Sequence, residues 1–137
     1  MKRCIVIADD DPIIVDLVKM RLGMAHFRVV STRDAATAME MVRTEQPVAV
    51  ILDVQMPGSG LAALAKIKAN PETAQLPVLM LTGERNPETV MAAMNGGAND
   101  YMVKPFNPDA LLERVARLVK LSTMTWDTSL PAPVWDV

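Results

Sequence analysis

The sequence predicts an α/β fold, a doubly wound, five-stranded parallel sheet with helices on both faces, forming a three-layer sandwich. Short apolar runs alternate strictly with segments of helical spacing. The runs are apolar enough to be buried on both faces, as in a parallel sheet between two helix layers. The chain has 137 residues, and 50% are hydrophobic, which suits one compact core.

Five short runs rich in β-branched residues are the predicted strands. They cover Cys4 to Ala8, Phe27 to Val30, Val48 to Leu52, Val78 to Leu81 and Tyr101 to Val103. Five such strands favour the flavodoxin-like order 2-1-3-4-5, a (βα)5 arrangement. That order opens a crevice beyond the carboxyl ends of strands 1 and 3, so the site is expected there.

Apolar residues three or four positions apart predict helices between the strands. The first three are marked by Ile14, Leu17, Val18 and Leu22, by Ala35, Ala38, Met39 and Val42, and by Leu61, Leu64 and Ile67. A fourth helix is expected from Pro87 to Gly96-Gly97. The last, with Pro108 in its first turn, carries Leu111, Val115, Leu118 and Val119 on one face.

Composition narrows the function classes. The chain has 14 Lys and Arg against 16 Asp and Glu, and the basic residues are scattered, so no nucleic-acid contact is predicted. A single cysteine, Cys4, excludes an internal disulfide. The apolar run after Met1 is too short for a signal peptide or a membrane span. We therefore expect a soluble, cytoplasmic protein without membrane contact.

Acidic residues follow two of the predicted strands. Asp9, Asp10 and Asp11 come directly after the first strand, and Asp53 ends the third. Like charges about 4 Å apart repel by roughly 4 kcal/mol at an effective dielectric near 20, so such a cluster must protonate or recruit a cation. Magnesium, which takes one or two carboxylates together with phosphate oxygens, fits a site built for a phosphoryl group. Asp10 and Asp53 are its expected direct ligands.

The last two strands each bring one polar side chain to the same edge. Thr82 follows strand 4 and Lys104 follows strand 5. Phosphoryl transfer needs in-line positioning and charge neutralisation, which a cation and Lys104 would supply. Asp53 is the predicted nucleophile and phosphoryl acceptor.

The site residues resemble the signature of response-regulator receiver domains in two-component signalling, and the resemblance covers about Lys2 to Lys120. The resemblance is carried by the acidic pair, Asp53, Thr82 and Lys104-Pro105, in that order. It implies a phosphorylation-activated switch rather than an enzyme, with self-catalysed transfer from a histidine kinase or phosphotransfer protein to Asp53. Residues 1–120 would be the receiver domain and 121–137 a tail or linker.

The resemblance also assigns individual roles. Asp9, Asp10, Asp53 and the backbone carbonyl of Gln55 would hold magnesium. Thr82 and Tyr101 would act as the switch, the bond before Pro105 would be cis, and helix 4, strand 5 and helix 5 would signal to an unknown effector. Gln55 and Glu84 would tune the loss of phosphate. A phosphorylation-dependent homodimer stays open.

One departure from the family pattern lies beside Asp53. The loop Met56-Pro57-Gly58-Ser59-Gly60-Leu61 is one residue shorter than the family's usual spacing to its glycine. Because this loop borders the metal site and often meets the kinase, the shortening bears on partner geometry more than on phosphorylation.

Three alternatives compete with the receiver function. A haloacid-dehalogenase-like phosphatase would use Asp9 as nucleophile and Asp11 in its Asp-x-Asp pair, but it leaves Asp53 unexplained. A flavin carrier is disfavoured because three aspartates would repel its phosphate. A phosphorylation-independent scaffold is disfavoured by the complete set of site residues. For Asp11 alone, a helix amino-terminal cap is the simpler interpretation.

The tail from Leu121 onward differs in composition from the rest of the chain. It holds both tryptophans, Trp126 and Trp135, together with Pro131 and Pro133. Tryptophan generally buries its ring against something. The segment would therefore dock on its own domain, bind a partner or pair with a second molecule, while the alternative is a linker.

Overall fold

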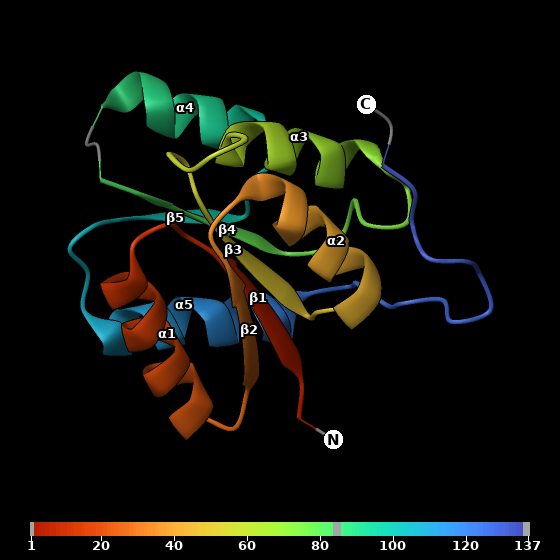
Figure 1. Ribbon diagram of the computed structural model, residues 1–137, viewed down its shortest axis with the longest axis horizontal. Helices are drawn as coiled ribbons and strands as arrows, with labels where there is room; N and C mark the ends of the chain where they lie inside the picture. Colours follow the sequence, from red (N-terminus) through yellow and green to blue (C-terminus); the bar gives the residue numbers. More distant parts are fainter. Residues whose placement is uncertain (1, 84–85, 136–137) are drawn as a thin grey trace.

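The computed structural model describes residues 2–83 and 86–135, with parallel strands in the order β2-β1-β3-β4-β5. The strands are β1 (Cys4–Ala8), β2 (Arg28–Thr32), β3 (Ala49–Asp53), β4 (Val78–Thr82) and β5 (Asp100–Val103). The helices are α1 (Pro12–Met24), α2 (Ala35–Glu45), α3 (Gly60–Ala69), α4 (Pro87–Asn95) and α5 (Pro108–Leu121). Helices α1 and α5 cover one face of the sheet, and α2, α3 and α4 cover the other (Figure 1). The predicted doubly wound fold and strand order are confirmed.

Alternating side chains of the central strands divide the core into two clusters. From β1, Ile5 and Ile7 pack with residues of α1 and α5. Val6 and Ala8 point to the opposite face and pack with residues of α2, α3 and α4. Every residue of β1, β3 and β4 is buried, as expected for strands covered on both faces.

The edge strands β2 and β5 are only partly buried. Strand β2 begins at Arg28 and reaches Thr32, whereas the apolar pattern predicted Phe27 to Val30. Phe27 instead finishes the turn after α1, where its N–H donates to the Leu22 carbonyl at 3.1 Å. The polar end of β2 is held by pairing of Thr32 with Ala8.

Helix starts carry the caps that their residue types favour. The Asp11 carboxylate accepts a hydrogen bond from the Ile13 N–H at 2.9 Å, which confirms that Asp11 caps α1. Asn86 and Asn107 cap α4 and α5, each directly before a proline. Helix α4 ends at Asn95 with Gly96 as its C-cap, close to the predicted boundary.

Parallel pairing brings the carboxyl ends of the strands to one edge. Asp53 is paired with Leu81, one residue before Thr82, and Thr82 is paired with Val103, one residue before Lys104. Asp9 follows the last residue of β1, which is paired with Leu52. In the described part of the chain no helix combines the length and apolar character needed to cross a bilayer.

Candidate functional site

The carboxyl edge of the sheet gathers three acids and one lysine. Asp9 and Asp53 are buried, with 0% and 3% of their surface exposed, while Asp10 is exposed. Carboxylate oxygens of these three residues all lie within 4.8 Å of one another. The predicted convergence of Asp9, Asp10 and Asp53 is therefore present in the structure.

Lys104 bridges the two buried acids. Its Nζ lies 2.7 Å from Asp9 Oδ2 and 3.4 Å from Asp53 Oδ2. The other Asp9 oxygen, Oδ1, accepts the Asp11 N–H at 2.9 Å, and Asp53 Oδ1 accepts the Gln55 N–H at 3.2 Å. The ammonium thus neutralises part of the charge that burial concentrates here.

Burial and the Asp9 charge raise the pKa of Asp53 to about 6, against the opposing effects of Lys104 and the Gln55 N–H. For Lys104, burial acts to lower the pKa. The hydrogen bond to Asp9 and the charges of Asp53 and Asp9 outweigh it, so the pKa of the ammonium is raised. Lys104 is charged at neutral pH, and Asp53 has a carboxylate that is costly to ionise without another cation.

The donor set fits a hard divalent cation. Asp9 Oδ2 is buried, and apart from Lys104 no described residue offers it a hydrogen-bond donor. Three carboxylates within reach of one another, one of them exposed, match oxygen coordination that keeps part of the water shell. The residues at this edge therefore suit magnesium.

The other predicted site residues lie around this cluster. Thr82 is buried at the end of β4, with 2% of its surface exposed. Tyr101 is half-buried on β5 and packs against the core cluster under α2, α3 and α4. The peptide bond between Lys104 and Pro105 is cis, and the Lys104 N–H donates to the Thr82 carbonyl at 2.8 Å. Glu84 lies outside the described residues.

The loop after Asp53 has a defined shape. Gly58 and Ser59 both adopt positive φ, at 87° and 69°. The Ser59 N–H donates to the Met56 carbonyl at 2.9 Å, while its hydroxyl accepts the Ala62 N–H at 3.3 Å and caps α3. The Pro57 carbonyl accepts the Ala35 N–H at 2.9 Å, which ties the loop to α2.

Gly60 starts α3 close to the carboxyl end of β3. A Cβ at this position would lie 1.9 Å from the carbonyl oxygen of Asp53. The backbone of α3 therefore approaches β3 as closely as only glycine allows.

Comparison with protein families identifies the family of this chain. The model for the response regulator receiver domain matches residues 5–116, most of the chain. The chain belongs to this family, the receiver domains of response regulators in two-component signalling.

The curated relatives are longer than this chain. The chain is 34% identical over 117 residues to the DNA-binding dual master transcriptional regulator RpaA of Synechocystis, covering 85% of this chain and 48% of RpaA. It is 31% identical over 122 residues to the probable transcriptional regulatory protein TcrX of Mycobacterium tuberculosis, covering 88% of this chain and 51% of TcrX. The chain thus spans about half the length of these curated relatives.

Solved structures agree on the fold. The chemotaxis response regulator CheY4 of Vibrio cholerae has a TM-score of 0.80 at 28% identity, covering 86% of this chain and 99% of that one. The signal receiver domain of a signal transduction histidine kinase from Syntrophus aciditrophicus has a TM-score of 0.84 at 27% identity, covering 93% and 98%. Receivers of similar shape therefore occur both in free regulators and in kinases.

Two features of the site lie beyond the sequence reasoning. The close pairing of Lys104 with Asp9, rather than chiefly with Asp53, depends on side-chain placement within the crevice. The close approach of Gly60 to the Asp53 carbonyl could have been suspected from the sequence only because the residue is a glycine.

Proposed function

We propose that this chain is a phosphorylation-activated switch in which Asp53 accepts a phosphoryl group from a histidine kinase or phosphotransfer protein. The observation that carries the proposal is the Lys104 bridge between Asp9 and Asp53 at the carboxyl edge of the sheet. Family membership supports the same chemistry. The receiver unit is taken as residues 1–120 and the tail as residues 121–137.

An Asp53 carboxylate oxygen forms the new O–P bond while the P–N bond to the donor's phosphohistidine breaks. Lys104 balances negative charge on the transferred oxygens, and the Gln55 N–H orients the Asp53 side chain through its 3.2 Å hydrogen bond. Asp10, Asp53 and the Gln55 carbonyl would hold magnesium directly, with Asp9 completing the acidic set. The bound ion would supply electrostatic stabilisation of the phosphoryl group.

Signal output is assigned to the surface of α4, β5 and α5. Thr82 lies at the end of β4, and Tyr101 lies on β5, only partly buried. We assign to them the family's switch role, in which Thr82 moves toward the phosphoryl group and Tyr101 turns inward. Exposed Met91 and Met94 on α4 give this surface apolar side chains that adapt to a partner.

Incubation with magnesium and acetyl phosphate, followed by intact mass measurement, tests the acceptor. Wild type should gain the mass of one phosphoryl group, and Asp53→Asn should gain none. Asp16→Asn, which removes an exposed carboxylate from α1, serves as the matched control and should behave as wild type. If Asp53→Asn is still modified while Asp9→Asn is not, Asp9 is the nucleophile and the proposal fails.

A further inference from the structure

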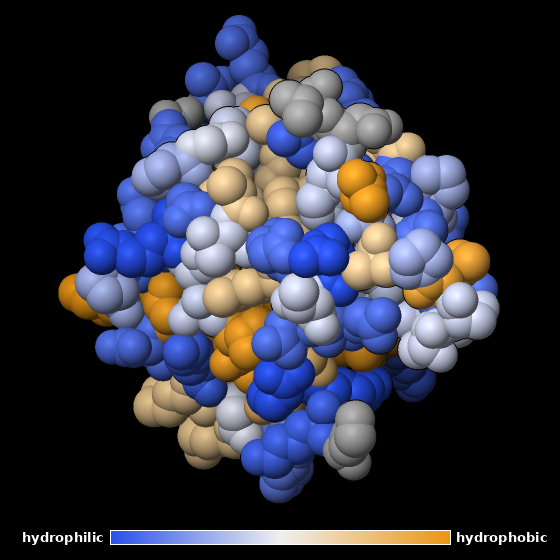
Figure 2. Space-filling model, turned by 45° about the vertical axis from the view of Figure 1, so that its right-hand side comes forward, coloured by the Kyte–Doolittle hydropathy of each residue, from blue (hydrophilic) through white to orange (hydrophobic). Residues whose placement is uncertain are grey.

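The C-terminal tail lies against the domain instead of extending away from it. After α5 the chain passes the end of the sheet and runs along α2 toward α3 (Figure 1). Met124, Trp126 and Trp135 are half-buried and pack on the core cluster shared by α2, α3 and α4. Pro133 is buried. On the face turned forward in Figure 2, hydrophilic residues surround separate apolar patches.

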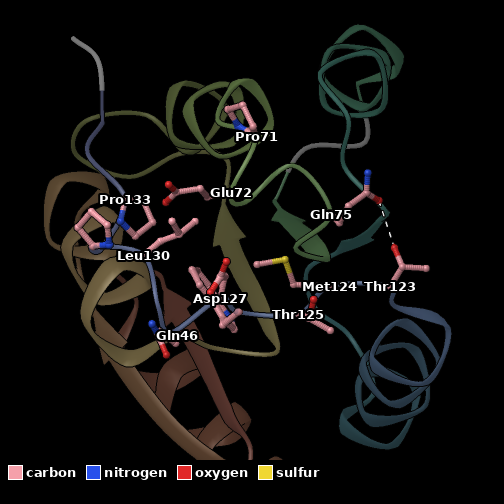
Figure 3. Close-up of a pocket in the computed structure, with 12 residues that line it drawn as sticks. Gln46, Pro71, Glu72, Gln75, Thr123, Met124, Thr125, Asp127, Leu130 and Pro133 are labelled. Carbon is pink, nitrogen blue, oxygen red and sulfur yellow. Dashed lines mark hydrogen bonds between the residues drawn. The ribbon is translucent and has the colours of Figure 1, made fainter.

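Trp126 is the first anchor of the tail. Its indole Nε1 donates a hydrogen bond of 2.8 Å to the backbone carbonyl of Pro47, in the turn between α2 and β3. Around it the tail and the domain enclose a groove of about 310 Å³. Figure 3 shows Leu130 and Pro133 from the tail facing this groove together with Glu72 from the domain.

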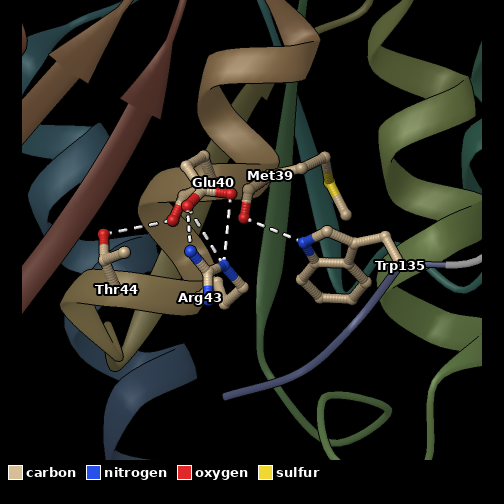
Figure 4. Close-up of polar contacts among 5 residues, drawn as sticks. All are labelled: Met39, Glu40, Arg43, Thr44 and Trp135. Carbon is tan, nitrogen blue, oxygen red and sulfur yellow. Dashed lines mark hydrogen bonds and ion pairs between the residues drawn. The ribbon is translucent and has the colours of Figure 1, made fainter.

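Trp135 is the second anchor. Its indole Nε1 donates to the backbone carbonyl of Met39 in α2 at 3.0 Å, and Figure 4 shows the ring beside the Met39 side chain. On its other side the ring borders a hollow lined by Ala65 and Ala69 of α3. The Asn70 side chain also donates to the Val134 carbonyl, at 3.4 Å.

These contacts have the character of peptide recognition. A tryptophan combines a large apolar ring with a single N–H donor, and burial of the ring requires a partner for that donor. Both indole N–H groups donate to backbone carbonyls of the domain, so no side chain of the domain is needed as an acceptor. Between the anchors the chain makes a turn, in which the Leu130 N–H donates to the Asp127 carbonyl at 3.3 Å. Pro131 and Pro133 follow this turn, and their fixed φ lowers the entropy lost on docking.

We propose that the surface formed by α2, the Pro47 turn and the carboxyl-terminal end of α3 is a binding site for a tryptophan-anchored, proline-containing peptide. Its occupant is this chain's own segment 122–135. The anchor at Pro47 lies at the amino-terminal edge of the sheet, because β3 starts at Ala49 and runs away from it to Asp53. The peptide site is therefore separate from the phosphoryl site, and it stands independently of the proposed function.

Single-tryptophan variants of the full chain test each anchor. Trp126→Phe leaves Trp135 as the reporter, and Trp135→Phe leaves Trp126. In each variant the remaining indole should emit at shorter wavelength, and be quenched less by acrylamide, than in the same variant unfolded in denaturant. Emission that matches the unfolded chain for either indole overturns the proposal. The blue shift should persist on dilution, whereas its loss would mean that the tail docks on a second copy.

A labelled peptide of residues 122–135 tests the site itself. It should bind the full chain carrying Trp126→Ala and Trp135→Ala, whose own tail has lost both anchors. Wild type, whose site is occupied, should bind it at least tenfold more weakly. Thr128→Ala, an exposed tail residue between the anchors, should behave as wild type. Equal binding to wild type and to the double variant, or binding to neither, would contradict the proposal. Far-UV circular dichroism verifies that the double variant is folded, and Trp126→Ala alone, with intermediate binding expected, replaces it if it is not.

Discussion

Lys104 Nζ lies 2.7 Å from Asp9 Oδ2, and this contact joins the end of β5 to the end of β1 across the whole carboxyl edge of β3 and β4. Asp9 is fully buried and Lys104 is half-buried, with 17% of its side chain exposed. An ion pair of this kind holds the crevice together, and losing one partner leaves a buried charge without compensation.

Lys104→Met should therefore destabilise the magnesium-free protein by about 3 kcal/mol, the lower end for breaking a buried pair. Urea unfolding at neutral pH in the presence of a chelator measures the change. Lys120→Met, which removes an exposed charge at the end of α5, is the control and should alter stability by less than about 0.5 kcal/mol. Equal effects of the two substitutions would show that the Lys104–Asp9 ion pair does not contribute to stability.

The raised pKa of Asp53 predicts a pH dependence in the absence of metal. Well below the unfolded-state pKa of 3.8 this carboxyl is neutral in both folded and unfolded chains. As pH rises toward the folded-state pKa of about 6, the unfolded chain ionises first, so folding loses stability. A pKa raised from 3.8 to about 6 corresponds to roughly 3 kcal/mol.

Asp53→Asn cannot titrate, so its stability relative to wild type should increase between pH 4 and pH 6 and then level off. Urea titrations at a series of pH values with chelator measure this difference. Magnesium should raise the melting temperature of wild type at pH 7 and have little effect on Asp53→Asn. A stability difference that does not change with pH would contradict the burial of an ionisable Asp53.

Gly60→Ala should destabilise the domain by about 3 kcal/mol or more, because the new methyl group meets the Asp53 carbonyl at 1.9 Å and the backbone itself must move. Gly23→Ala is a matched control within the same chain. Gly23 lies in the last turn of α1 with nothing within 4 Å of an added Cβ, so alanine should stabilise by a few tenths to about 1 kcal/mol. Thermal or urea unfolding distinguishes the two signs directly.

The position of the tail predicts that its tryptophans do not sense phosphorylation. Trp126 and Trp135 bind Pro47 and Met39, while the proposed output surface is on α4, β5 and α5. Beryllofluoride with magnesium should raise the melting temperature through Asp53 and leave tryptophan emission unchanged. A change in emission that Asp53→Asn abolishes would couple the tail to the switch.

The arrangement of elements could be predicted because short apolar runs alternate with segments of helical spacing along this chain. The convergence of Asp9, Asp10 and Asp53 followed from topology, since parallel strands end at one edge. The different burial of Asp9 and Asp10 did not, because adjacent residues after a strand point in different directions. The binding positions of Trp126 and Trp135 could not be predicted from the sequence either, because their hydrogen-bond acceptors are backbone carbonyls, which every residue possesses.

The docked tail also narrows the choice of surfaces open to other molecules. Large apolar side chains left to solvent among the described residues are Ile13, Met20, Met24, Met91, Met94, Leu121, Leu130 and Val134. Outside the tail they lie on α1, on α4 and at the end of α5, and none lies on α2 or α3 within the described chain. A protein that recognises this molecule by apolar contact would therefore approach from the α1 side, the α4 side or the end of α5. One that binds the α2–α3 side would have to compete with a ligand already covalently attached.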